Sequence, residues 1–389
     1  MSPSSKPKDA LRVTKPSKRL HDFAADLTHA LNRCVPSDDP HPYDQVVVLA
    51  IHWYNDDLDV VPLENKLLDV FKKIYHYDVE SYTIPQKQPD KSLINRLSNW
   101  TLQYADKRTL RICIYSGHAS AVGPTDENWY FGGRLNSDGT LAGPTLDWHR
   151  VRSSCESSDG GDDGDLCYIF DCCSAGSGAL YDGPELICAS EFEQMAGASL
   201  MFAFTQALID TLKDLNGEPC SLANMFSILY RNSSQHSVAA SPLHILEKNT
   251  SSIVLQKLTT GQCTLLKSDT QKSKHKVLIS VHLFDDRPDL KSWENWLTKS
   301  MPSGVLSADI KIESVFDSKS SIILVTLPLE LWTMLDPTDQ AFTFIGFVTS
   351  SNRLTLGGQG QLQLPFHGSS SPQSKENTPF SHQYRKSLG

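Results

Sequence analysis

Three apolar runs of strand length most constrain the fold of this chain. They are residues 46–53 (VVVLAIHW), 110–118 (LRICIYSGH) and 166–173 (LCYIFDCC). Each run is continuous rather than alternating, which is typical of strands that are buried on both faces of a parallel sheet. Segments with helical spacing of apolar residues follow or separate these runs; they are 61–75, 92–105, 199–215 and 221–232. Parallel strands need such crossovers, so the sequence predicts an α/β domain with a mainly parallel sheet and helices on both faces.

Changes in composition predict four regions along the chain. Residues 1–43 begin with a basic segment rich in Ser and Pro, and we expect them to be largely disordered. The α/β domain is predicted over 44–260, with a Thr-, Ser-, Gln- and Lys-rich linker around 249–275. Residues 276–350 have the order strand, helix, strand, strand, helix, strand, which predicts a small ferredoxin-like α+β domain. Its first helix is predicted at 289–299, and the tail at 357–389 is predicted to be disordered.

Charge and cysteine content exclude several classes of function. The net charge of −9 argues against a nucleic-acid-binding surface over the whole protein. No apolar stretch approaches the roughly 18 residues that span a bilayer, and the N-terminus lacks an apolar signal core. The nine cysteines form no CxxC pair and no repeated spacing, which predicts reduced thiols. We therefore expect a cytoplasmic protein with no membrane span and no nucleic-acid partner.

A histidine and a pair of cysteines follow two of the buried strands. His118 is predicted just past one strand, and Asp171, Cys172 and Cys173 just past another. The carboxyl ends of parallel strands share one edge of a sheet, so we expect these residues to lie close together there. An imidazole can take the proton of a thiol and later protonate a leaving amine, so the pattern indicates acyl transfer by a Cys–His dyad. The structural alternative is that both thiols and the histidine serve packing.

Cys172 has two interpretations of its own. Neighbouring residues at a strand end point to opposite faces, so Cys172 is expected to be buried in packing. The other interpretation is a resolving thiol beside a reactive one.

The segments YSGH (115–118) and DCCSAG (171–176) resemble motifs of the caspase and metacaspase superfamily of cysteine peptidases. The resemblance is to caspase-domain proteins of filamentous fungi; it covers about residues 44–260 and continues into the C-terminal region. It implies peptide-bond hydrolysis with His118 as the catalytic histidine and Cys173 as the nucleophile. Gly117 and the backbone around Cys173 would form the oxyanion site. A role in regulated cell death is implied at the level of the family.

The resemblance also implies a substrate preference, and two departures leave an alternative open. Asp171 matches an acidic residue at the floor of the substrate pocket, which implies cleavage after Arg or Lys. Glu64 matches a second acidic pocket residue, although its position also suits compensation of a helix N-terminal charge. Ala119 replaces a glycine of the family, and Ser174–Ala175 replaces His–Ser. The alternative function is an inactive scaffold or regulator that binds protein partners, with the C-terminal domain as a possible surface.

An acidic, glycine-rich segment raises the question of calcium. Residues 159–165 read DGGDDGD, and Asp147 and Asp182 could add ligands. The spacing of a calcium-binding loop is absent, and such segments are often simply solvated. We predict no cofactor, with calcium as the alternative that the resemblance to metacaspases implies.

Overall fold

The computed structural model describes residues 17–34, 42–122, 128–156, 163–172, 183–189, 203–235, 242–246, 250–258, 276–284, 310–316, 321–336 and 339–349. Cys173, most of the predicted linker, the helix predicted at 289–299 and the predicted tail lie outside these residues.

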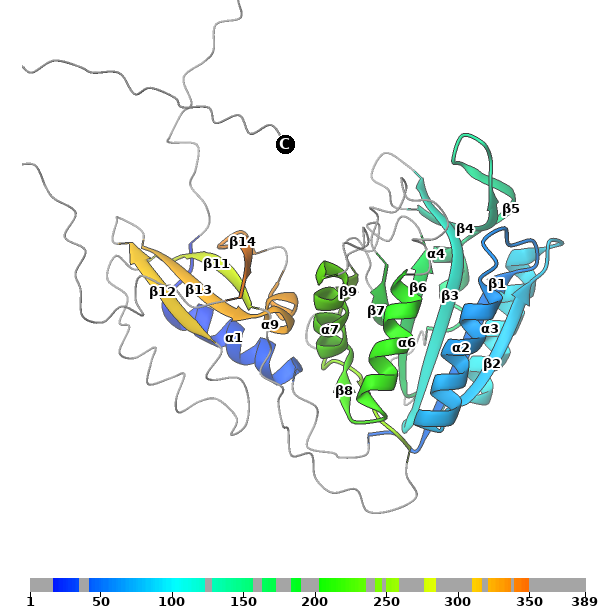
Figure 1. Cartoon of the computed structure of the whole chain (residues 1–389), viewed down its shortest axis with the longest axis horizontal. Helices are drawn as coiled ribbons and strands as arrows, with labels where there is room; N and C mark the ends of the chain where they lie inside the picture. Colours follow the sequence, from blue (N-terminus) through cyan, green and yellow to red (C-terminus); the bar gives the residue numbers. More distant parts are fainter. Residues whose placement is uncertain are drawn as a thin grey trace, which may run out of the picture. The chain divides into compact units, whose positions relative to one another are not determined.

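The described helices and strands alternate over much of the chain (Figure 1). The strands are β1 (Gln45–Trp53), β2 (Asp78–Ile84), β3 (Thr109–Val122), β4 (Asn128–Leu135), β5 (Leu141–Asp147), β6 (Asp165–Cys172), β7 (Glu185–Cys188), β8 (Cys220–Ser221), β9 (Leu243–Ile245), β10 (Val254–Leu255), β11 (Lys276–His282), β12 (Lys311–Phe316), β13 (Ile322–Pro328) and β14 (Phe342–Val348). The helices are α1 (Leu20–Cys34), α2 (Val61–Val70) with a wider π-helical turn η2 (Phe71–Tyr75), α3 (Pro89–Gln103), α4 (Trp148–Arg152), α6 (Ala203–Leu215), α7 (Leu222–Gln235) and α9 (Leu329–Met334). No helix in the described part of the chain is long and apolar enough to cross a bilayer.

The larger sheet has the strand order β2-β1-β3-β6-β7-β9. Neighbours in this order are parallel except β7 and β9, which are antiparallel. Strands β4 and β5 extend the same eight-stranded sheet, because β4 pairs antiparallel with β3 and with β5. Apolar residues of α2, α6 and α7 pack in the core on one face, and those of α3 and α4 pack in the core on the other. Figure 1 shows α2 and α6 side by side over this sheet. The predicted α/β class, with a mainly parallel sheet covered on both faces, is confirmed.

Two strand ends differ from the prediction. His118 lies inside β3 rather than past it, and Asp171 and Cys172 are the last two residues of β6. The reason is a change of partner: residues 110–117 of β3 pair in parallel with β6, whereas 118–122 pair antiparallel with β4. The strand therefore continues because a second neighbour takes over its backbone hydrogen bonds.

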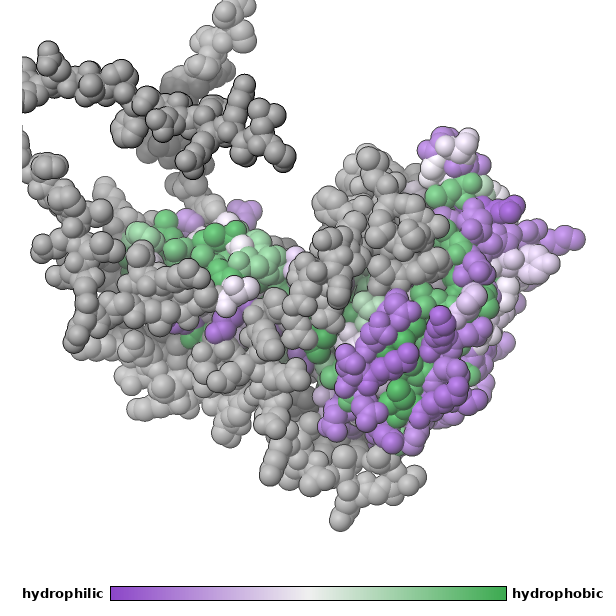
Figure 2. All heavy atoms as spheres, viewed as in Figure 1, coloured by the Kyte–Doolittle hydropathy of each residue, from purple (hydrophilic) through white to green (hydrophobic). Residues whose placement is uncertain are grey.

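The C-terminal strands form a separate sheet in the order β12-β13-β11-β14. All three pairs of neighbours are antiparallel, so β11 and β12 run in the same direction with β13 between them. This is the arrangement of a split βαβ unit, as the order of elements predicts. Figure 2 shows hydrophobic residues over this sheet; exposed members on its edge strands are Phe316, Phe344, Ile345 and Phe347. The domain boundaries and a partner for this surface stay predictions.

The expectation of disorder over residues 1–43 is wrong for residues 20–34. Helix α1 buries Phe23, Leu27, Ala30 and Leu31 at helical spacing. The Phe23 ring lies 5.5 Å from that of Phe342, centroid to centroid. The expectation of disorder rests on the basic residues before the helix, although the apolar residues of α1 recur at helical spacing. The predicted start of the linker is also wrong, because residues 253–255 are buried and β10 pairs with β8.

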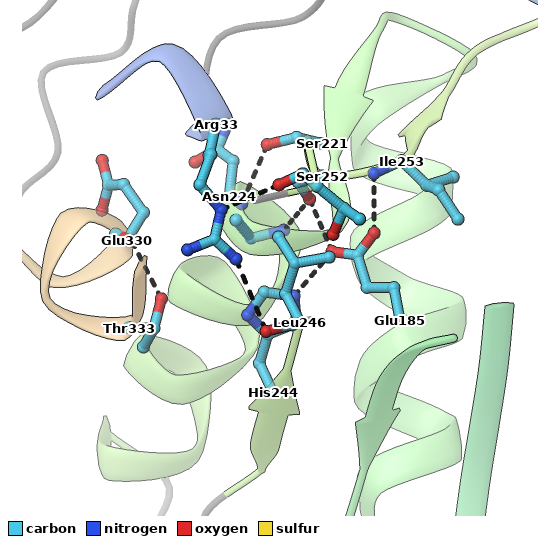
Figure 3. Close-up of polar contacts among 12 residues, drawn as sticks. Arg33, Glu185, Ser221, Asn224, His244, Leu246, Ser252, Ile253, Glu330 and Thr333 are labelled. Carbon is cyan, nitrogen blue, oxygen red and sulfur yellow. Dashed lines mark hydrogen bonds and ion pairs between the residues drawn. The ribbon is translucent and has the colours of Figure 1, made fainter. Parts of the chain in front are cut away.

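A buried polar cluster holds the end of α1 against two other segments (Figure 3). Arg33 donates from Nε to the Thr250 carbonyl at 2.8 Å and from Nη1 to the Met334 carbonyl at 3.1 Å. Next to it, Glu185 accepts hydrogen bonds from the Ser252 hydroxyl and the Ile253 N–H, both at 2.6 Å. Because buried charges need such partners, this cluster fixes where α1 and the segment at 250–253 lie.

Burial of α1 predicts that a single truncation in it destabilises the fold. We expect Leu27→Ala to lower the free energy of unfolding by about 2–5 kcal/mol, because Leu27 has no exposed surface. Leu102→Ala is the matched control, since 78% of Leu102 is exposed and its loss should cost less than about 0.5 kcal/mol. Urea unfolding followed by circular dichroism measures both, and equal effects would contradict a folded, packed α1.

Candidate functional site

A pocket lies at the carboxyl-terminal edge of the larger sheet. Its volume is about 270 Å³ including the open mouth. The lining residues come from β3 at the point where its pairing with β6 ends, from the end of β6, from α2 and the loop before it, and from the start of α6. They are Leu58, Val60, Leu63, Glu64, Ser116, Gly117, Asp171 and Thr205. Three of the predicted site residues, Gly117, Asp171 and Glu64, are thus brought together here.

Asp171 enters the pocket from β6. Alternation along the strand places Cys167 and Ile169 in the core beneath α2 and α6, and Asp171 is the next residue on that face. Its Oδ2 accepts hydrogen bonds from the backbone N–H and the hydroxyl of Thr205 in the first turn of α6. Burial raises the pKa of the Asp171 carboxyl to about 6, and the two hydrogen bonds oppose that rise only in part.

Glu64 reaches the pocket from the first turn of α2, where Pro62 is suited to a helix start. Its carboxylate is 1% exposed and lies 3.1 Å from Nδ1 of His52. Ser81 donates its hydroxyl to the same carboxylate at 2.8 Å. Glu64 is therefore held by β1 and β2 as a fixed, buried carboxylate, in addition to lying at a helix N-terminus.

The His118 side chain is 3% exposed and has one charged partner at hydrogen-bond distance among the described residues. Its Nε2 lies 2.6 Å from Oδ1 of Asp57. An ionised carboxylate can only accept, so this contact assigns the ring hydrogen to Nε2. Nδ1 is then the basic atom, and it is buried without a hydrogen-bond partner among the described residues. The contact with Asp57 thus orients the ring on one side, and the nitrogen on the other side has no hydrogen-bond partner in the described part of the chain.

Asp57 is the residue that sequence analysis missed. It lies in the loop after β1, in the segment YNDDLD, where carboxylates are common and uninformative. Its backbone N–H donates to the Gly133 carbonyl at 3.1 Å, and its Oδ2 accepts from the Leu135 N–H at 3.4 Å. Both contacts come from β4, whose Gly132 pairs with His118. The pairing of β4 with β3 is a tertiary contact that no local sequence motif predicts.

Gly117 and Tyr115 shape the backbone next to the imidazole. Gly117 has φ of +151°, and a Cβ there would lie 2.8 Å from the Tyr115 hydroxyl oxygen. That hydroxyl donates to the His118 carbonyl at 2.7 Å, and its ring stacks on Phe131 of β4. A side chain at position 117 would therefore displace the tyrosine that supports His118, which explains a glycine at this position.

The other sequence expectations at the site have mixed outcomes. Cys172 is 1% exposed and lies in the aromatic core with α3 and α4, as expected for packing. Ala119 is buried opposite Phe131 and has no left-handed backbone, so alanine fits where the family has glycine. Cys173, with the segment 174–175, lies outside the described residues. Its role stays a prediction.

The structure leaves calcium as a prediction. Asp147 caps α4 by accepting a hydrogen bond from the His149 N–H at 3.0 Å. Within the described ranges, no group of three or more His, Cys, Asp or Glu side chains is arranged to hold a metal ion. Residues 159–162 and Asp182 are outside those ranges.

No protein-family model and no curated protein matches this chain. Among solved structures, the chain is similar to caspase-1 from Spodoptera frugiperda, with 10% identity and a TM-score of 0.37, over 59% of this chain and 98% of that one. It is also similar to a Geobacter sulfurreducens protein solved as a structural genomics target, with 12% identity and a TM-score of 0.32, over 52% of this chain and 93% of the other.

The raised pKa of Asp171 predicts a pH-dependent gain in stability when its charge is removed. In the folded state the carboxyl holds its proton up to about pH 6, whereas an unfolded Asp releases it near pH 4. The wild type therefore loses stability relative to Asp171→Asn as pH rises from about 4 to about 6, by about 2–3 kcal/mol. Asparagine keeps an oxygen that can accept both Thr205 hydrogen bonds.

Chemical unfolding of both proteins at pH 4.5, 5.5 and 7.5 measures this difference. Asp69→Asn, which removes an exposed carboxylate from α2, controls for the loss of one negative charge. If the difference in free energy of unfolding between wild type and Asp171→Asn does not grow with pH, this result would contradict a pKa of Asp171 that is raised by burial.

Proposed function

We propose that this protein is a cysteine endopeptidase that cleaves after Arg or Lys, with Cys173 as nucleophile and His118 as proton carrier. The observation that carries the proposal is the parallel register of β3 and β6, in which Gly117 lies level with Cys172. His118 follows Gly117 in β3, and Cys173 follows Cys172 in the sequence. Chain geometry alone then keeps their Cα atoms within about 12 Å of each other.

Alternation along the strands supports the same pairing. On β3, Ile112 and Ile114 face the α2 and α6 side, and Ser116 lines the pocket there. His118 is the next residue of that series. On β6, Asp171 lines the same pocket, and residue 173 is two positions further along the sequence. The covalent chain therefore keeps residue 173 near the edge of the sheet at which His118 lies, and a Cys–His dyad needs such proximity.

The proposed reaction uses only groups of this chain and water. The thiol proton of Cys173 moves to Nδ1 of His118, and the thiolate attacks the carbonyl carbon of the scissile bond. Backbone N–H groups of Gly117 and Cys173 stabilise the oxyanion of the tetrahedral intermediate. The imidazolium returns its proton to the leaving amine as the C–N bond breaks. Water then hydrolyses the thioester, which releases the acid and restores the thiol.

The charge of the pocket supports a cationic substrate side chain. Asp171 and Glu64 line it, and its described lining includes no lysine or arginine. A buried carboxylate is strongly stabilised by a cation that pairs with it. A guanidinium would offset the burial that raises the pKa of Asp171 and would draw this group into its ionised form. The proposal therefore assigns Asp171 and Glu64 to recognition of the residue before the scissile bond.

The alternative, an inactive scaffold, draws on the exposed aromatic residues of the C-terminal sheet, which suit a protein partner. It gives no reason for a buried imidazole that is oriented by Asp57 next to a pocket lined by two carboxylates. Cytoplasmic location, calcium dependence and a role in regulated cell death rest on the sequence resemblance and stay predictions.

Short fluorogenic peptides that differ only in the residue before the leaving group test the proposed function. We expect cleavage after Arg and Lys and none after Asp, with turnover abolished in Cys173→Ala. Asp171→Asn should lower kcat/KM for the Arg peptide by about 100-fold or more, because one desolvated charge pair is lost. Assays with calcium and with a chelator also test the metal prediction. Preference for Asp would contradict the assignment of the pocket, and no turnover under either condition would favour the scaffold.

A further inference from the structure

We infer that Asp57 is a positioning residue for His118, which makes the proposed centre a Cys–His–Asp arrangement rather than a dyad. The expected effect on kinetics rests on the proposed function, whereas the positioning of the His118 ring by Asp57 rests on the geometry alone. Asp57 contacts the imidazole on the nitrogen opposite the one that faces the thiol in the proposed mechanism. The 2.6 Å contact to Nε2 fixes both the ring orientation and the tautomer.

The tautomer decides whether His118 can act as a base. Neutral imidazole carries one hydrogen, and the ring nitrogen that carries it cannot accept a proton. With Nε2–H donated to Asp57, the lone pair is on Nδ1, the buried nitrogen that has no partner among the described residues. Once Nδ1 has taken the thiol proton, the nearby carboxylate stabilises the resulting imidazolium. Asp57 therefore acts through His118 and never touches the substrate.

The surrounding structure holds Asp57 in place before any substrate arrives. Its backbone and side chain are both bonded to β4, the strand that also pairs with His118. A Cβ at Gly133 would lie 2.6 Å from Oδ1 of Asn55, so the loop packs directly on this strand. Strand β4 thus holds both the His118 imidazole and the Asp57 carboxylate. Little conformational entropy is then lost when the two groups act together in the reaction.

A neighbouring carboxylate has a different task. Asp56 accepts a hydrogen bond from the Val60 N–H at 3.0 Å, at the start of α2. Burial raises the pKa of Asp56, and the His118 charge opposes that rise. Among the described residues, Asp56 interacts with His118 through its charge, whereas Asp57 makes the hydrogen bond to the ring.

The test compares Asp57→Asn with Asp59→Asn. Asp59 is an exposed residue of the same loop with left-handed backbone, which asparagine also tolerates. Asparagine at position 57 can donate its amide to Nε2 and so move the ring hydrogen to Nδ1. We expect kcat for the Arg peptide to fall about 10- to 100-fold in Asp57→Asn, with KM changed less than about threefold. The acid limb of the kcat/KM profile should also move to lower pH, because the imidazolium loses the carboxylate that stabilises it. Asp59→Asn should match wild type in all three measures.

A readout that needs no activity separates this inference from the proposed function. Nitrogen-15 NMR of histidine-labelled protein reports which ring nitrogen carries hydrogen, and the signals lost in His118→Gln assign the residue. We expect the Nε2–H form in wild type and in Asp59→Asn, and a gain of the Nδ1–H form in Asp57→Asn. That result supports the positioning role even if no peptide is cleaved. An unchanged tautomer in Asp57→Asn would overturn it, whatever the kinetics.

Discussion

The hydrogen-bonded parallel register of β3 and β6 fixes the candidate site. It sets Gly117 level with Cys172 and Ser116 level with Asp171, so chemistry-bearing residues more than fifty positions apart in sequence share one edge of the sheet. Because the side-chain period of a strand is two, a slip of one residue would turn His118 or Asp171 to the opposite face. Buried cores on both faces of the sheet make such a slip costly. The packing of the core is therefore what holds the site in register.

The second feature is the change of partner along β3. Up to residue 117 the strand belongs to the parallel sheet, and from His118 onward it pairs with β4. Gly117 lies at the junction with a backbone conformation that side chains disfavour, next to the Tyr115 hydroxyl that supports His118. Strand β4 also forms hydrogen bonds with the backbone and the side chain of Asp57. Orientation of the imidazole is thus tied to an element that the parallel sheet alone would not supply.

Much of this could be predicted from sequence, for reasons that differ between residues. The buried strands are continuous apolar runs, and their order and the helices between them follow from periodicity. The meeting of Gly117 and Asp171 follows from parallel strands having a common carboxyl edge. Asp57 could not be found in that way, because its contact with His118 depends on how β4 folds back. Helix α1 was overlooked for another reason: its stripe of Phe23, Leu27 and Leu31 follows a strongly basic segment that suggested disorder.

The most direct measurement of the central claim is the pH dependence of alkylation at Cys173, followed by mass spectrometry. If the imidazole of His118 lies within proton-transfer reach, the thiol should react well below pH 8, because a neighbouring imidazolium lowers the pKa of a thiol from about 8.5. His118→Ala should move the midpoint of the rate profile up to the range of an ordinary cysteine. Identical profiles for the two proteins would contradict the pairing of these two residues and, with it, the proposed peptidase.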